Sequence, residues 1–222
     1  MESVDSGLGP MHAMCVAAAP GRQLGVDVLT LPQARAWGTE LARLHEAAGE
    51  FGDGLPVGFA ELEQVAGLDD PPLVDSVRRL VDRLDRLPRD PSRYGVIHGD
   101  FELDNLAWVG DTPTSFDFDD AARSWFVADI ALAVRDLTSA GTPTPTYKGR
   151  FDAFLAGYRQ RRPLPEADLA DLPLFAAAAT AARLIKLYPV LHTDGADELN
   201  ELRIKLTKIV AEDRRAVLTF DA

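Results

Sequence analysis

Residues 94–120 constrain the fold of this 222-residue chain most, because they contain short β-like runs in a sequence that otherwise has helical spacing. The three runs are Tyr94–Ile97, Leu106–Val109 and Thr114–Phe118. The turn-forming sequence Gly-Asp-Thr-Pro at 110–113 separates the second run from the third. The pattern therefore predicts a small central β-hairpin between helical regions.

Polar side chains lie at the open end of this predicted hairpin. Asn105 directly precedes its first strand, and Asp117 lies near the end of its second strand. Closing the hairpin brings Asn105 and Asp117 side by side, because paired strands lie about 5 Å apart. Asp100 belongs to the loop just before the first strand. We therefore expect three oxygen-bearing side chains to converge on one small volume.

Such a group of oxygens suits the transfer of a phosphoryl group. A carboxylate has to accept or orient the proton of the attacking hydroxyl, and hard oxygen ligands have to hold the Mg²⁺ ions that neutralise the polyphosphate. The formal net charge of the chain is -12. Bound metal ions let such a chain take up ATP, because they bridge carboxylates and phosphates that would otherwise repel each other.

Two motifs around this group resemble a known family. His98–Asn105, HGDFELDN, is similar to the H-G-D-x-x-x-x-N catalytic loop of aminoglycoside phosphotransferases, choline kinases and related small-molecule kinases of the protein-kinase-like superfamily. Phe116–Asp120, FDFDD, resembles the metal-binding motif that follows this loop in the superfamily. The order of the two motifs, with a hairpin between them, makes the resemblance specific.

The resemblance implies a role for five residues. Asp100 is expected to be the catalytic base, and Asn105 and Asp117 are expected to bind Mg²⁺, with ATP as the co-substrate. His98 and Asp129 are expected to support the shape of the catalytic loop, Asp129 through hydrogen bonds to its backbone. The reaction implied is transfer of the ATP γ-phosphoryl group to a hydroxyl of a small molecule.

Other segments extend the resemblance over most of the chain. Pro20–Leu24 resembles the hinge that leads into the C-terminal lobe of these kinases. Gly38–His45 resembles the first helix of that lobe, and Phe154–Arg159 resembles a later helix. The implied fold is mainly α (α+β): the C-terminal lobe of a protein-kinase-like fold with a small central β-hairpin and with the N-terminal ATP lobe largely absent.

Helical signals outside the hairpin agree with a helical lobe. Thr30 and Gln33 form a predicted capping box, and apolar residues recur at helical spacing after it. We expect residues 1–25 to form a leader, loose over 1–10, and a remnant hinge strand, and residues 26–222 to form the helical catalytic lobe. The predicted elements are a strand at His12–Ala18 and helices at about Leu31–Ala48, Pro71–Leu87, Val127–Leu137, Tyr147–Arg161, 166–188 and 196–218.

The lysines depart from the family pattern. Related kinases carry a smaller lobe with a phosphate-covering loop and a strand lysine that pairs with the ATP phosphates. The first lysine of this sequence is Lys148, after the metal-binding motif. To explain the absence of this lobe, we favour the hypothesis that the sequence is a fragment or a mis-started reading frame of a longer enzyme. A second hypothesis is that another chain supplies the lobe. The alternative is a catalytically inactive binding or regulatory module, and an uncovered cleft wall favours self-association or a partner chain.

Several acidic residues allow more than one interpretation. Glu102, Asp104 and Asp120 are candidates for binding a cationic acceptor, such as an amino sugar or amino alcohol, although exposed loop carboxylates are often only solvated. Asp119 or Asp120 is a further candidate for the metal site. A metal-dependent hydrolase built on the pair Asp117 and Asp119 is a third hypothesis, which lacks the other motifs that such hydrolases need. His45 is expected to be a core histidine with one satisfied nitrogen.

Composition excludes several other classes of protein. A net charge of -12 without a visible basic face argues against nucleic acid as a partner. The longest apolar run, near Phe175–Ala182, is too short to span a bilayer, and no secretory signal is visible. The single cysteine, Cys15, excludes an internal disulfide and a cysteine-rich metal site. We expect a cytoplasmic protein with no membrane partner.

Overall fold

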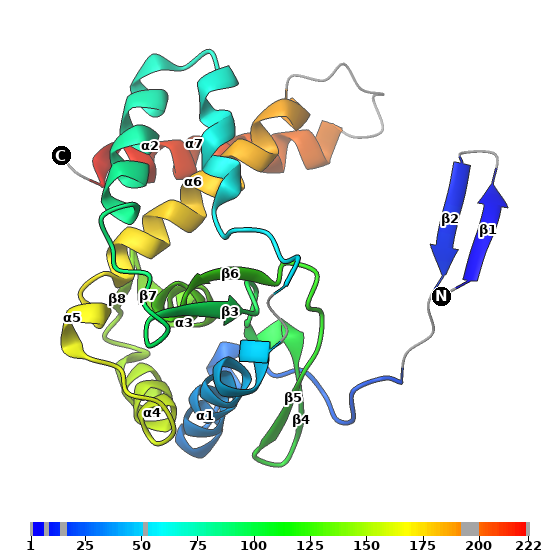
Figure 1. Cartoon of the computed structure of the whole chain (residues 1–222), viewed down its shortest axis with the longest axis vertical. Helices are drawn as coiled ribbons and strands as arrows, with labels where there is room; N and C mark the ends of the chain where they lie inside the picture. The colour runs from blue at the N-terminus through cyan, green and yellow to red at the C-terminus, as the bar shows by residue number, and fades with distance from the viewer. Residues whose placement is uncertain (1, 7–8, 14–16, 51–52, 192–199, 221–222) are drawn as a thin grey trace.

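The computed structural model describes residues 2–6, 9–13, 17–50, 53–191 and 200–220, and these are mainly helical (Figure 1). The helices are α1 (Leu31–Ala47), α2 (Pro71–Leu84), α3 (Phe126–Ala133), α4 (Lys148–Arg159), α5 (Glu166–Leu169), α6 (Leu172–Leu191) and α7 (Asn200–Thr219). The strands form four antiparallel pairs in the described part of the chain: β1 (Glu2–Ser6) with β2 (Gly9–Ala13), β3 (Tyr94–Ile97) with β6 (Ala122–Trp125), β4 (Leu106–Val109) with β5 (Thr112–Ser115), and β7 (Thr138–Ser139) with β8 (Thr142–Pro143).

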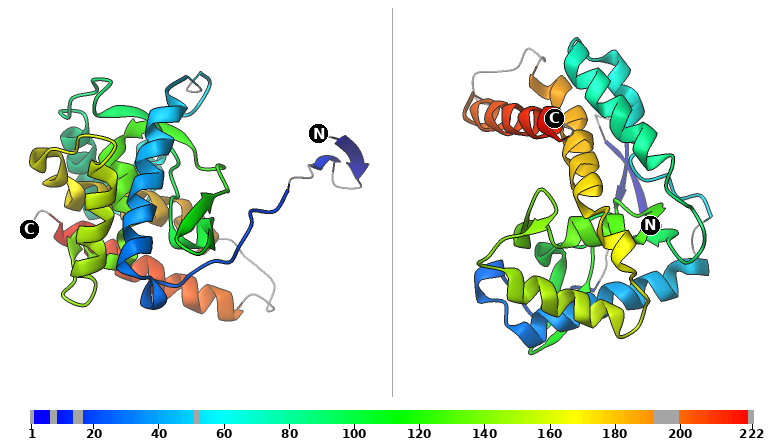
Figure 2. Two further views of the ribbon diagram at one scale, coloured as in Figure 1. Left: turned by 90° about the horizontal axis from the view of Figure 1, so that it is seen from below. Right: turned by 90° about the vertical axis from the view of Figure 1, so that its left-hand side faces the viewer.

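Helices α1 and α4 lie side by side because two glycines let their backbones approach closely (Figures 1 and 2). A Cβ atom on Gly38 of α1 would lie 2.0 Å from the carbonyl oxygen of Phe154 in α4. A Cβ atom on Gly157 of α4 would lie 1.9 Å from the carbonyl oxygen of Arg35 in α1. Helix α1 begins at the capping box predicted from the sequence, with Thr30 as the N-cap.

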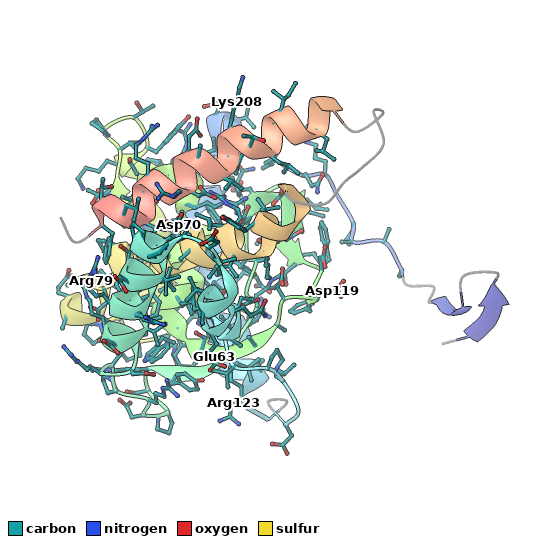
Figure 3. The ribbon with its side chains drawn as sticks, turned by 90° about the horizontal axis from the view of Figure 1, so that it is seen from above. Glu63, Asp70, Arg79, Asp119, Arg123 and Lys208 are labelled. Atoms are coloured by element: carbon teal, nitrogen blue, oxygen red, sulfur yellow. The ribbon has the colours of Figure 1, made fainter. Side chains whose placement is uncertain are left out.

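Helices α2, α6 and α7 form a second group on the other side of the small sheets (Figures 1 and 2). Asp70, the N-cap of α2, binds Arg214 of α7 through two hydrogen bonds and lies next to α7 in Figure 3. The two helical groups share one continuous apolar core, in which Trp37, Phe154 and Phe175 are fully buried. The catalytic-loop region between β3 and β4 is therefore held between two packed helical layers.

The central hairpin forms, with one shift from the prediction. β5 covers Thr112–Ser115, whereas the sequence pattern placed this strand at Thr114–Phe118. The shift follows from a tight turn at Gly110 and Asp111, which pairs Val109 with Thr112. Asp117 therefore lies just after the strand rather than inside it.

The N-terminal segment also differs from expectation. Residues 1–10 were expected to form a loose leader, but β1 and the beginning of β2 form a hairpin there, which projects from the helical body in Figure 1. Of the strand predicted at His12–Ala18, only the first two residues belong to β2, and 14–16 lie outside the described residues. Farther along, Arg22 pairs with Trp108 at the edge of β4.

Three predicted helices have different bounds. The helix expected at 166–188 is two helices, α5 and α6, which are separated at Ala170 and Asp171. The helix expected at Val127–Leu137 ends at Ala133 and continues as a short 3₁₀ helix, Arg135–Leu137. The last predicted helix begins at Asn200 rather than 196, and 192–199 lie outside the described residues. Within the described ranges, no helix combines the length and the apolar character that a membrane span requires.

Candidate active site

Asp100 and Asn105 are brought together by the loop between β3 and β4. The amide nitrogen Nδ2 of Asn105 donates to the carboxylate oxygen Oδ2 of Asp100 and to its backbone oxygen, both at 2.8 Å. These bonds occupy the amide nitrogen and leave Oδ1 of Asn105 to act as an acceptor or a metal ligand. They also fix the direction in which the Asp100 carboxylate points.

Asp117 reaches the same end of the hairpin. The backbone N–H of Phe116 donates to the backbone oxygen of Asn105 at 3.1 Å, so Asp117 follows directly after a residue bonded to Asn105. Asp117 is exposed and has a φ of 64°, in the left-handed region that few non-glycine residues adopt. The chain therefore leaves the direction of strand β5 at Asp117, the residue expected to bind the metal.

The oxygen donors at this end of the hairpin suit Mg²⁺, which takes few ligands from the protein, better than they suit a metal ion whose whole coordination shell is protein. Among the described residues, no group of three or more histidine, cysteine, aspartate or glutamate side chains could hold a metal ion. Mg²⁺ in nucleotide-dependent enzymes is bound through one or two protein oxygens, with phosphate oxygens and water completing its shell. The amide oxygen of Asn105 and the carboxylate of Asp117 are a donor set of this kind.

His98 connects the catalytic loop to the strand end that precedes Asp117. Its Nε2 lies 3.1 Å from the backbone oxygen of Phe116, and its Nδ1 lies 3.3 Å from the backbone nitrogen of Asp100. A carbonyl can only accept and a backbone N–H can only donate, so the proton is on Nε2. The buried ring therefore ties the positions of Asp100 and Asp117 together.

Asp129 of α3 binds the backbone of the catalytic loop. Its fully buried carboxylate accepts hydrogen bonds from the backbone N–H groups of His98, at 2.8 Å, and of Gly99, at 3.0 Å. Buried carboxylates are stable only when their oxygens are satisfied by donors. The loop and α3 are therefore fixed relative to each other immediately before Asp100.

Asp129 is in turn held by His45, which is a buried core histidine as expected, although more of its ring is bonded than predicted. Both ring nitrogens of His45 are bonded, rather than one: Nε2 lies 2.9 Å from Oδ2 of Asp129, and Nδ1 lies 2.8 Å from the hydroxyl of Tyr158. Burial lowers the pKa of His45, so the ring is neutral at neutral pH, donating from Nε2 and accepting at Nδ1. This chain of buried polar groups joins α1, α4 and α3 to the catalytic loop.

Glu102 lies in the same loop and is almost completely buried, with 5% of its side chain exposed. It forms an ion pair with Arg135, and its other oxygen, Oε1, has no hydrogen-bond partner among the described residues. Burial raises the pKa of Glu102 above its ordinary value, whereas the guanidinium of Arg135 opposes this shift by stabilising the carboxylate. Asp104, by contrast, is exposed.

A pocket of about 960 Å³ opens beside the loop, between the 119–122 segment, the end of α3, and helices α6 and α7. Of the three residues predicted to bind a cationic acceptor, only Asp120 lines it; Glu102 lies behind Arg135, and Asp104 is not among the described lining residues. Asp119 also lines the pocket and lies at the periphery of the ribbon in Figure 3.

Sequence reasoning missed the three basic residues of this pocket. They are Arg135, Arg183 and Lys186. No motif marks them: Arg183 and Lys186 lie on α6, and only the fold brings them to the same pocket as Arg135, which follows α3. One signal was available for Arg135: Glu102 stands between apolar Phe101 and Leu103, and a buried carboxylate of this kind requires a basic partner.

Comparisons with known proteins agree with this geometry. The sequence profile of the phosphotransferase enzyme family matches residues 5–164. The chain is 30% identical over 118 residues to an amicoumacin kinase of Bacillus subtilis (strain 168), covering 51% of this chain and 34% of that protein. It is 33% identical over 155 residues to a homoserine kinase of Methylorubrum populi, covering 65% of this chain and 48% of that protein. The chain thus spans from about a third to just over half of the length of the curated relatives it matches.

A solved structure shows the same fold. The amicoumacin kinase hAmiN, in complex with AMP-PNP, Ca²⁺ and Ami, superposes with a TM-score of 0.73 at 21% sequence identity, covering 90% of this chain and 63% of that chain. The family match covers more than half of the chain and contains the catalytic loop, the hairpin and Asp129. The chain belongs to the phosphotransferase enzyme family and has the fold of small-molecule kinases of the protein-kinase-like superfamily.

Proposed function

We propose that this protein transfers the γ-phosphoryl group of ATP to a hydroxyl group of a small molecule. The observation that carries the proposal is the pair of 2.8 Å hydrogen bonds from Asn105 to Asp100, which orients one carboxylate and leaves one amide oxygen open toward the end of the hairpin. The relatives are kinases of small molecules, and the solved hAmiN complex contains an ATP analogue and a divalent cation.

The chemistry assigned to the residues follows from these positions. Asp100 accepts the proton of the acceptor hydroxyl as it attacks, because its carboxylate is held by Asn105 and its backbone N–H is bonded to the ring of His98. Asn105 and Asp117 would hold Mg²⁺, which neutralises charge on the phosphates when bound. Asp129 keeps the loop in the geometry that the transfer requires.

The proposed acceptor binds in the 960 Å³ pocket and carries a cationic group. Asp119 and Asp120 line this pocket and are exposed, so they are available to an ammonium group.

Substitution of the proposed base tests this function. We expect Asp100→Asn to lower kcat for formation of phosphorylated product from Mg²⁺-ATP and an amino alcohol by at least about 10²-fold, the usual contribution of a positioned general base. Product is measured by ³¹P NMR. The matched control is Asp104→Asn, which changes an exposed carboxylate of the same loop.

Near-normal turnover by Asp100→Asn would show that Asp100 is not the base. A wild-type protein that binds nucleotide and acceptor without forming product would instead favour the alternative, an inactive kinase-fold module with a binding or regulatory role. The thermal unfolding midpoint of each variant excludes loss of folding as the cause of lost activity.

A further inference from the structure

Arg135 links the catalytic loop to the wall of the acceptor pocket. It begins the short 3₁₀ helix after α3, and 49% of its side chain is exposed where it lines the pocket. One of its terminal nitrogens, Nη2, pairs with the buried carboxylate of Glu102. Glu102 belongs to the same loop as Asp100 and interacts with it, so the pair connects Arg135 to the loop that carries the proposed base.

Most hydrogen-bond donors of Arg135 are left open. A guanidinium carries five N–H donors in a planar fork, and Glu102 engages it through one nitrogen. Its Nε lies 4.0 Å from Asp136, which is beyond hydrogen-bond distance. The exposed part of the guanidinium therefore presents N–H groups to the pocket that form no hydrogen bond with the described residues.

The other two cations of the pocket are already paired. Arg183 donates from Nε and Nη2 to both carboxylate oxygens of Asp213, at 2.9 and 2.6 Å. Lys186 lies 3.0 Å from Glu61 and 3.7 Å from Asp120. Among the described cations of this pocket, Arg135 is the one whose geometry is open to an anionic group.

We propose that Arg135 binds a carboxylate group of the acceptor, held in place by Glu102 as a positioning residue, and that the acceptor is a small hydroxy amino acid. This inference rests on the proposed function and names the substrate class of its site. The planar fork matches a carboxylate, with two parallel hydrogen bonds. Asp120 also lines the pocket and lies 3.7 Å from Lys186, beyond hydrogen-bond distance, so its oxygens can bind the ammonium group of the same molecule.

The carboxylate is favoured over a phosphate by the charges around the pocket. Asp119, Asp120 and Glu212 line it together with the three cations, two of which are paired. A doubly charged phosphate would meet this acidic wall, whereas a zwitterion presents one charge to Arg135 and the opposite charge to Asp120. Glu102 keeps the guanidinium on the side of the pocket nearest the catalytic loop.

The test compares two ligands that differ only by the carboxylate: L-homoserine and 3-aminopropan-1-ol. Their binding to the full-length protein is measured by isothermal titration calorimetry without nucleotide, so it does not depend on phosphoryl transfer. We expect the wild-type protein to bind L-homoserine at least about tenfold more tightly, the size of one charge-assisted interaction. Equal affinity for the two ligands, or no binding of L-homoserine at millimolar concentration, would overturn the proposal.

Variants assign the preference to Arg135. Arg135→Lys keeps the charge beside Glu102 but loses the fork, and we expect it to weaken L-homoserine binding without changing that of 3-aminopropan-1-ol. The double variant Glu102→Gln with Arg135→Gln leaves no buried unpaired charge and is expected to bind both ligands within about twofold. The matched control is Arg43→Gln, which removes an exposed arginine of α1 outside the pocket. A preference retained in the double variant would overturn the proposal.

The single variant Glu102→Gln tests whether Glu102 orients Arg135 or only supports the fold. We expect it to weaken binding of L-homoserine and to leave binding of 3-aminopropan-1-ol unchanged, because only the carboxylate uses the guanidinium. An equal loss for both ligands would show that Glu102 supports the fold and does not orient Arg135. If the protein binds L-homoserine but forms no phosphorylated product when Mg²⁺-ATP is added in a separate assay, the proposed function is contradicted and the carboxylate site stands.

Discussion

Gly99 shows how one residue sets the geometry of the catalytic loop. Its φ is 84°, and a Cβ atom there would lie 2.1 Å from the backbone oxygen of Asp120. The backbone contact leaves no flexible side chain that could move aside. Glycine is therefore required both for the left-handed conformation and for the close approach of the loop to the acidic segment.

We expect Gly99→Ala to lower the free energy of unfolding by about 3 kcal/mol, the sum of left-handed strain and overpacking. Gly110→Ala is the matched control, because Gly110 also has a positive φ, 60°, but no atom lies within 4 Å of its Cβ position. For the control we expect a loss of about 1 kcal/mol. Urea denaturation measures both values. Equal losses of unfolding free energy in the two variants would show that the close contact with Asp120 does not exclude a side chain at position 99.

The sequence motifs predicted the neighbours within the catalytic loop and its bond to Asp129, but not the contacts of His45 and Arg135 behind them. Asn105 and Asp100 are five positions apart, so motif spacing was enough to bring them together. His45 and Asp129 are 84 positions apart, and their bond depends on the packing of α1 against α3. Arg135 was missed for the same reason, since its partner Glu102 lies on another element.

At the scale of elements, Asp70 performs two functions that can be separated. One carboxylate oxygen accepts from the backbone N–H of Leu73 as the N-cap of α2, and both oxygens bind Arg214 of α7. The guanidinium of Arg214 lowers the pKa of Asp70 below its ordinary value. The ion pair therefore stabilises the fold above the unfolded-state pKa of about 4 and is lost as the pH falls through the lower folded-state pKa.

Two substitutions distinguish the cap from the ion pair. Asp70→Asn keeps the cap and loses the charge, so we expect a loss of about 1 kcal/mol at pH 7 and a flatter decline of stability below pH 4. Asp70→Ala also removes the cap and should cost about 1 kcal/mol more. Urea unfolding at pH 7 and pH 3 measures these effects. The same acid slope in Asp70→Asn as in the wild type would exclude the ion pair as its source.

Elements specified by nearby residues were predicted well, and elements that depend on distant partners were not. The start of α1 at Leu31 follows from the local capping box of Thr30 and Gln33. Strand β6 was not predicted, because Ala122–Trp125 is extended only by pairing with β3. Asp171, whose backbone oxygen accepts from the backbone N–H of Phe175 at the start of α6, divides the segment 166–188 that the sequence predicted as one helix.

The whole molecule combines a strongly acidic surface with a site proposed for a polyanion. The formal net charge is -12, and the donor set at the hairpin end consists of the Asn105 amide and the Asp117 carboxylate. Free ATP is repelled by such a chain, whereas a metal-bound nucleotide is attracted by oxygens that ligate the metal. Nucleotide binding by this protein should therefore depend on the divalent cation more strongly than on any basic residue.

We accordingly expect ATP with Mg²⁺ to raise the thermal unfolding midpoint, and ATP with EDTA to leave it unchanged. At tenfold excess over Kd the stabilisation is about 1.4 kcal/mol, which corresponds to roughly 3–6 °C for a chain of this size. Asp117→Asn should remove the shift. The matched control is Asp111→Asn, an exposed aspartate at the opposite end of the same hairpin, which should keep it. EDTA removes the metal ion, and Asp117→Asn removes the carboxylate that would bind it, so each condition breaks the proposed link between carboxylate, metal and phosphate. A thermal shift that persists under either condition would mean that the nucleotide binds at another site.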